Sequence, residues 1–103
     1  MKNTIEINGK EYKIKKIFSK DWREIFKFDE ERKDILLIDF VDKHCEVLAG
    51  VLEDVTVEEL QNTLTVDEIM EIYNAILKYL LTLLSAKKDD EKNAVEGKEL
   101  SQS

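Results

Sequence analysis

Residues 55–70, VTVEELQNTLTVDEIM, contain the same helix-start signal twice. Thr56 is followed by Glu59 and Thr65 by Glu68, so both segments match the S/T-x-x-E capping box. In this motif the Thr side-chain oxygen accepts a hydrogen bond from the Glu backbone N–H, and the Glu carboxylate accepts one from the Thr backbone N–H. Two boxes in such a short segment require the chain to start two helices in close succession.

Apolar residues flank both boxes at the positions of a hydrophobic staple, in which the residue before the cap packs against the fourth residue of the helix. The two predicted staples are Val55 with Leu60 and Leu64 with Ile69. A box together with its staple defines a helix boundary well. The pattern therefore predicts a short helix over residues 57–63 and a long helix over residues 66–86.

The long helix carries more apolar residues than one packing neighbour covers. Its apolar side chains fill an arc of roughly 200°, against about 100° for an ordinary surface helix. Two interpretations stay open: the helix lies centrally in the core, or part of the arc contacts another protein or a second copy of the chain. The candidate protein-binding residues are Met70, Tyr73, Leu77, Leu80, Leu81 and Leu84.

A second strongly patterned helix is predicted over residues 35–50, and Asp34 is expected to open it. Its apolar arc is again roughly 200° wide and includes His44 and Cys45. Gly50 either caps this helix or lies inside its last turn. The polar side consists of Asp39, Asp42, Lys43, Glu46 and Gly50.

The N-terminal segment TIEINGKEYKIKKI has the pattern of a β-hairpin. Asn8-Gly9 suits a two-residue type I′ turn, in which both central residues have positive φ. The residues that then share the apolar face are Ile5, Ile7, Tyr12 and Ile14. This face must pack on the helices, because a lone hairpin is marginally stable in water.

These elements predict a mainly α (α+β) fold, in which a two-stranded N-terminal hairpin is followed by about four helices in a small bundle. Ser19 is expected to cap the first helix, over residues 20–30, with Asp21 in its first turn. A length of 103 residues favours a single domain. We expect this domain to span residues 1–87 and the charged residues 88–103 to form a disordered tail.

The net charge of −7 is unevenly distributed. Residues 1–33 carry +3, residues 34–86 carry −9 and residues 87–103 carry −1. The acidic helical region disfavours nucleic acid and anionic membranes as partners, because both require contacts from Lys and Arg. The single cysteine excludes an intramolecular disulfide, and no apolar run has the length of a signal peptide or a membrane span. We therefore expect a soluble protein of the cytoplasm.

No group of residues indicates a catalytic or metal site. His44 is the only histidine, and a general base or a zinc site needs a partner or further ligands. Its neighbour Cys45 diverges from it by about 100° on a helix, so we expect both to be structural residues. Asp39, Asp42 and Glu46 share a face but lack a second set of ligands, which favours a solvated surface. The chain is not expected to be an enzyme or to need a cofactor.

The layout of the chain resembles the tail assembly chaperones of long-tailed bacteriophages and of prophages in Gram-positive bacteria. A hairpin, IEINGKEYKIK, precedes an acidic helical body, DFVDKHCEVLAGVLED through VDEIMEIYNAILKYLLTLL, and a charged tail. The resemblance covers about residues 3–86 and concerns layout, since the family has no sharp motif. It implies a chaperone in the bacterial host cytoplasm that binds the tape measure protein, keeps it soluble and helps the tail tube polymerise around it. The tail tube protein is a further expected partner.

Two other functions stay open. An acidic regulator would occupy the basic site of a partner and would need its acids on one exposed patch. A homo-oligomeric structural protein of a virion would bury its apolar arc against further copies of itself. A chaperone needs apolar surface for its client together with net charge for solubility, and residues 34–86 supply both.

Overall fold

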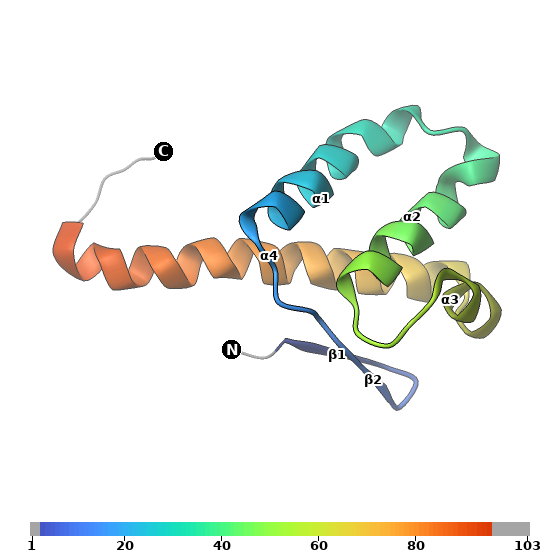
Figure 1. Cartoon of the computed structure of the whole chain (residues 1–103), viewed down its shortest axis with the longest axis horizontal. Helices are drawn as coiled ribbons and strands as arrows, with labels where there is room; N and C mark the ends of the chain where they lie inside the picture. Colours follow the sequence, from blue (N-terminus) through green and yellow to red (C-terminus); the bar gives the residue numbers. More distant parts are fainter. Residues whose placement is uncertain (1–2, 96–103) are drawn as a thin grey trace.

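The computed structural model describes residues 3–95 and confirms the predicted mainly α fold with an N-terminal hairpin. In Figure 1, α4 runs along the whole length of the molecule, α1 and α2 form an arch on one side of it, and the hairpin lies on the other side. The elements are β1 (Thr4–Ile7), β2 (Lys10–Lys13), α1 (Ser19–Glu31), the 3₁₀ helix η1 (Arg32–Asp34), α2 (Leu37–Val51), α3 (Val57–Thr63) and α4 (Val66–Val95).

The hairpin has the predicted turn and register. Asn8 and Gly9 have φ angles of 53° and 79°, as a type I′ turn requires, and Ile5 pairs with Tyr12. The apolar face packs on the helices as predicted. Its buried residues are Ile7, Tyr12 and Ile14.

The hairpin also pairs with the chain that follows α2, which the sequence does not predict. An antiparallel bridge joins Ile14 to Leu52. The backbone N–H of Lys15 donates a 2.8 Å hydrogen bond to the carbonyl of Val51. These contacts attach the hairpin to the end of α2 as well as to α4.

The second capping box forms completely. The Glu68 N–H donates to Thr65 Oγ1 at 3.3 Å, and the Thr65 N–H donates to Glu68 Oε1 at 2.9 Å. The other carboxylate oxygen of Glu68 accepts a 2.6 Å hydrogen bond from the side-chain amide of Asn8. Glu68 of this capping box therefore also holds the tip of the hairpin.

The first capping box is only half formed. The Glu59 N–H donates to Thr56 Oγ1 at 3.1 Å, as predicted. The Glu59 carboxylate does not complete the box; its partner among the described residues is the Lys10 ammonium of β2, at 3.1 Å. The opposite charge of Lys10 competes with the neutral Thr56 amide for this carboxylate. Both capping glutamates thus contact the hairpin.

Two helix starts differ from the predicted ones. Phe18, not Ser19, is the cap residue of α1, because the Asp21 carboxylate accepts the Phe18 N–H at 3.0 Å and a carboxylate is a stronger acceptor than a hydroxyl. Asp34 ends η1, and α2 begins only at Leu37. The intervening residues turn the chain through the corner between α1 and α2.

The last helix is longer than predicted. α4 continues to Val95, past the predicted end at residue 86, because neither Gly nor Pro interrupts the sequence before Gly97. The expected disordered tail, residues 88–103, therefore overlaps the last turns of this helix, and residues 96–103 lie outside the described residues.

The hydrophobic core lies where α4 meets α2, α3 and the hairpin. Both helix-side staple residues, Leu60 and Ile69, are buried in it, and Val55 and Leu64 pack against it half-buried. All four staple residues are therefore at least partly buried, as the staple pattern requires. Gly50 lies inside the last turn of α2. Further fully buried side chains are Leu48, Leu52, Ile72, Tyr73, Ile76 and Leu80.

A partly buried polar network joins α1, η1, α2 and α4. Arg32 Nε lies 3.4 Å from Asp29 Oδ1, and Arg32 Nη1 donates to His44 Nε2 at 3.0 Å. The Arg32 guanidinium also lies over the ring of Tyr73, whose hydroxyl donates to Asp29 at 2.8 Å. His44 Nδ1 lies 2.7 Å from the Phe40 carbonyl. Because Arg32 can only donate, His44 is neutral and carries its proton on Nδ1.

The capping boxes predict a measurable loss of stability on truncation. Thr65→Ala removes the acceptor of the Glu68 N–H and should lower the free energy of unfolding by about 1 kcal/mol, as should Thr56→Ala. Thr63→Ala is the matched control, because its hydroxyl bonds inside α3 to the Glu59 carbonyl, and it should change stability by less than about 0.5 kcal/mol. Denaturant midpoints that do not separate the cap variants from this control would contradict the capping roles.

His44 should make the fold sensitive to mild acid. Burial lowers its pKa below the ordinary value of 6.5, and the nearby Arg32 cation lowers it further, against the opposing effects of the Phe40 carbonyl and Asp29. Well above pH 6.5 the ring is neutral in the folded and the unfolded chain. As the pH falls through 6.5, the unfolded chain binds a proton first, so the free energy of unfolding decreases until the folded pKa is passed.

Urea denaturation at about pH 7.5 and about pH 5.5 measures this decrease. The control is His44→Gln, which retains one donor and one acceptor but does not titrate. It should show a smaller decrease over the same interval. If both proteins lose equal stability, His44 is not the group responsible.

Candidate interaction surface

The candidate residues on α4 divide between core and surface. Leu81 and Leu84 are 50% and 52% exposed. The remaining candidates lie deeper: Tyr73 and Leu80 are fully buried, and Met70 and Leu77 are half-buried against the core. One side of the apolar arc is therefore core and another side stays uncovered, so the first interpretation applies to part of the helix and a contact with another protein stays a prediction for the rest.

Leu77, Leu81 and Leu84 form an apolar line on α4, which we call the α4 stripe. Their i, i+4, i+7 spacing places them on one face of the helix. The first turn of α1 lies close by, because the Trp22 indole N–H donates a 3.2 Å hydrogen bond to the carbonyl of Leu80.

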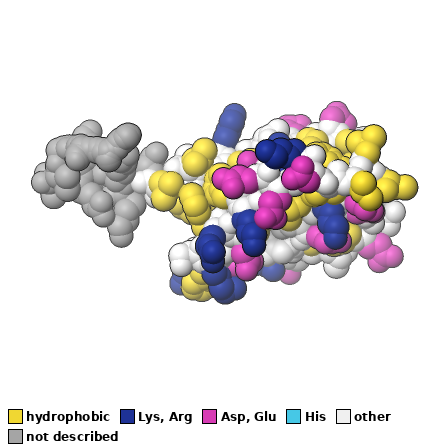
Figure 2. Space-filling model, turned by 90° about the horizontal axis from the view of Figure 1, so that it is seen from above, with side chains coloured by type: hydrophobic (Ala, Val, Ile, Leu, Met, Phe, Trp, Pro, Cys, Tyr) yellow, Lys and Arg dark blue, Asp and Glu magenta, His cyan; other side chains and the backbone are white. Residues whose placement is uncertain are grey.

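A second apolar surface lies at the corner of the arch. Leu36, Leu37 and Ile38 are 70%, 89% and 85% exposed, and we call these three residues the α2 tip. Figure 2 shows hydrophobic side chains gathered at the right-hand end of the molecule, the end at which Figure 1 places the start of α2. Leu36 occupies the cap position without a side-chain acceptor for the helix amides. This helix start therefore has neither a polar cap nor a covering element among the described residues.

The sequence pattern does not single out the α2 tip, because these residues belong to the apolar arc of the predicted second helix and the pattern does not separate buried from exposed positions on it. A signal was nevertheless present. Consecutive residues of an α-helix are 100° apart, so three in a row span about 200°. A core on one side of a helix does not cover such a span, and at least one of the three had to face away from it.

Charged side chains of both signs cover much of the face seen in Figure 2. Lys43 lies 3.9 Å from Glu46 in an exposed pair, and such pairs contribute little to stability. Asp42, from the predicted acidic face, accepts a 2.6 Å hydrogen bond from Gln61 of α3. The residues Asp42, Lys43 and Glu46 thus lie on a solvated surface.

The described residues show neither a metal site nor a reactive thiol. They contain no group of three or more His, Cys, Asp or Glu side chains placed to hold a metal ion. Cys45 is fully buried, and burial raises the pKa of its thiol, which keeps it in the unreactive protonated form. In the part of the chain that the structure describes, no helix has the length and hydrophobicity needed to cross a membrane.

No known protein family, curated protein or solved structure matches this chain. Its function is therefore inferred from the surfaces that it exposes. The α2 tip and the α4 stripe are the candidates, because each concentrates large apolar side chains outside the core.

The assignment of these residues to surface or core can be tested with one substitution at two positions. Leu37→Ala, on the α2 tip, should change the free energy of unfolding by less than about 0.5 kcal/mol. Leu80→Ala removes a fully buried side chain and should cost roughly 2–5 kcal/mol. Chemical denaturation measures both values. A loss at Leu37 as large as that at Leu80 would show that the tip is part of the folded core.

Proposed function

We propose that this protein is a chaperone that holds an apolar segment of another protein on the α2 tip and the α4 stripe. The exposure of the α2 tip carries the proposal. Leu37 and Ile38 contribute almost nothing to the core, and they keep apolar area in contact with water that folding does not bury. A contiguous apolar surface of this kind is typical of a site that another protein covers.

The charge of the chain supports the same function. Residues 34–86 carry −9, and they include both the α2 tip and the α4 stripe. Net charge of one sign keeps copies of the protein apart and soluble while apolar side chains stay exposed. This combination suits a protein that must offer apolar surface to a client without aggregating.

The proposed client is the tape measure protein of a long-tailed phage, with the tail tube protein as a further partner. The resemblance to tail assembly chaperones supports this choice, because the hairpin, the acidic helical body and the charged C-terminal segment occur in that family in the same order. Two exposed surfaces at different places on one domain also suit a client that is long and apolar.

The test is co-expression with an apolar fragment of a tape measure protein from the same phage or prophage genome. The parent chain should keep the fragment soluble and should be recovered with it by affinity capture. Leu37→Glu and Leu81→Glu should lose this effect, because each places a charge on one apolar surface. Thr82→Glu is the matched control, because Thr82 is an exposed polar residue of α4 that lies about 100° around the helix from Leu81, and it should behave like the parent.

Circular dichroism must show that each variant is folded before its result is used. If the parent does not hold the fragment, the chaperone proposal is wrong. If Leu81→Glu instead converts an oligomer of the parent into a monomer in light scattering, a second copy of the chain is the partner of the α4 stripe. Strongly salt-dependent binding to a basic protein, unaffected by either leucine variant, would favour the acidic regulator.

A further inference from the structure

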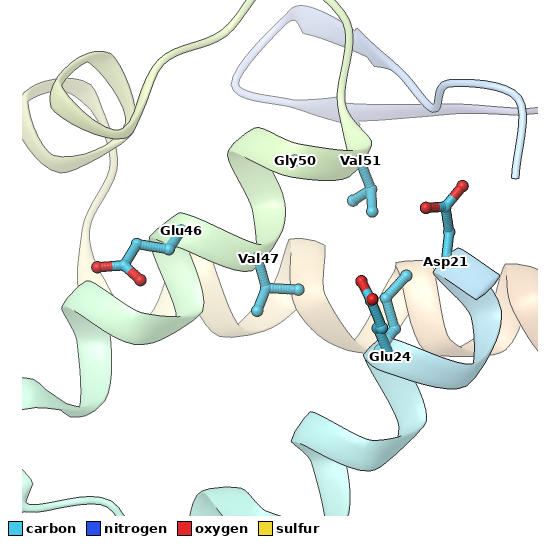
Figure 3. Close-up of a pocket in the computed structure, with 7 residues that line it drawn as sticks. Asp21, Glu24, Glu46, Val47, Gly50 and Val51 are labelled. Carbon is cyan, nitrogen blue, oxygen red and sulfur yellow. The ribbon is translucent and has the colours of Figure 1, made fainter.

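A groove of about 210 Å³ lies between α1 and the last turns of α2. Its apolar lining comes from Ile25 of α1 and from Val47 and Val51 of α2. Figure 3 shows Asp21 and Glu24 on the α1 wall with their carboxylates directed into the space opposite α2, while Glu46 projects from the far end. The groove therefore combines apolar side chains with the carboxylates of Asp21 and Glu24.

Gly50 lines the same groove, and the fold itself does not require a glycine there. A Cβ atom built at this position meets no atom within 4 Å, so neighbouring side chains leave the space open. The positive φ that follows α2 belongs to Asp54, not to Gly50. Glycine inside a helix costs stability relative to alanine. The missing side chain instead widens the groove and lets another molecule approach the α2 backbone.

The carboxylates in the groove differ in whether they already have hydrogen-bond or ion-pair partners. Asp21 accepts the Phe18 N–H and lies 3.4 Å from the Lys20 ammonium. Among the described residues no cation is paired with Glu24, although it stands on the groove wall (Figure 3). Glu24 is thus the groove carboxylate that has no cationic partner among the described residues.

We propose that this groove binds one long cationic side chain, lysine or arginine, of a partner protein. The aliphatic stem lies on Val47, Val51 and the open face of Gly50, and the charged head meets Glu24 and the rim of the groove. Long basic side chains favour this arrangement, because their methylene groups bury well while the head keeps polar contacts. Charge complementarity thus identifies the occupant. The inference rests on the proposed function for the identity of the partner, whose apolar segment would carry this residue.

The probe is a pair of short amphipathic helical peptides that differ only at one central residue, arginine in one and its uncharged near-isostere citrulline in the other. Each is titrated into the ¹⁵N-labelled full chain, and backbone amide shifts around Gly50 and Glu24 are followed. The arginine peptide should bind about fivefold more tightly, as expected for a partly exposed ion pair.

Two variants locate the site. Glu24→Gln should remove the preference for arginine, whereas Glu30→Gln, an exposed glutamate on α1 outside the groove, should preserve it. Gly50→Leu should fill the groove and abolish binding of both peptides at this position without loss of helix content. Equal affinity of the two parent complexes, no binding of the arginine peptide, or equal effects of the two glutamate variants would each overturn the proposal.

The outcome is separable from that of the proposed function. If the chain keeps the tape measure fragment soluble but binds both peptides equally, the chaperone proposal stands and the groove proposal is wrong. If the chain distinguishes the peptides but does not hold the fragment, the groove proposal stands and the tape measure protein is not the client.

Discussion

The contacts of Arg32 set the position of the arch formed by α1 and α2 relative to α4. Arg32 lies in η1, and its partners Asp29, His44 and Tyr73 lie on α1, α2 and α4. Aromatic contacts reinforce the same point, because the rings of Phe28 and Tyr73 both pack edge-on against His44. A polar network is stabilising when every buried member has a partner, and here buried His44 and Tyr73 both contact the partly exposed Arg32. The α2 tip and the groove between α1 and α2 both depend on this arrangement.

The sequence predicts those parts of the fold whose energetics are local. The Asn8-Gly9 turn and the box of Thr65 with Glu68 are made by residues a few positions apart, so their signals are complete within a short segment. The start of α2 is different. It depends on Arg32, whose hydrogen-bond and ring partners lie on α2 and on α4. No local pattern reveals that such a distant partner will fix the preceding corner.

The division of α4 into core and surface is also beyond a single helix pattern. Tyr73 and Leu81 both belong to its apolar arc, but one is fully buried and the other is half exposed. The difference arises because Tyr73 and Leu80 lie on the side of α4 that packs into the core, whereas Leu81 lies about 100° further around the helix, on a side that stays partly uncovered. Periodicity gives the width of an apolar arc; only the packing of other elements decides which part of it remains uncovered.

The α2 tip shows why a well-held corner matters for binding. Leu36 provides no polar cap for the helix, so the local sequence contributes little to the order of this turn. Its position is instead set by a contact behind it. Arg32 precedes the corner and His44 follows it, and Arg32 Nη1 donates a 3.0 Å hydrogen bond to His44 Nε2. An apolar surface fixed in this way loses little conformational entropy when a partner covers it, and less of the binding free energy is spent on ordering it. The same network that stabilises the fold would therefore also lower the entropic cost of covering the exposed leucines.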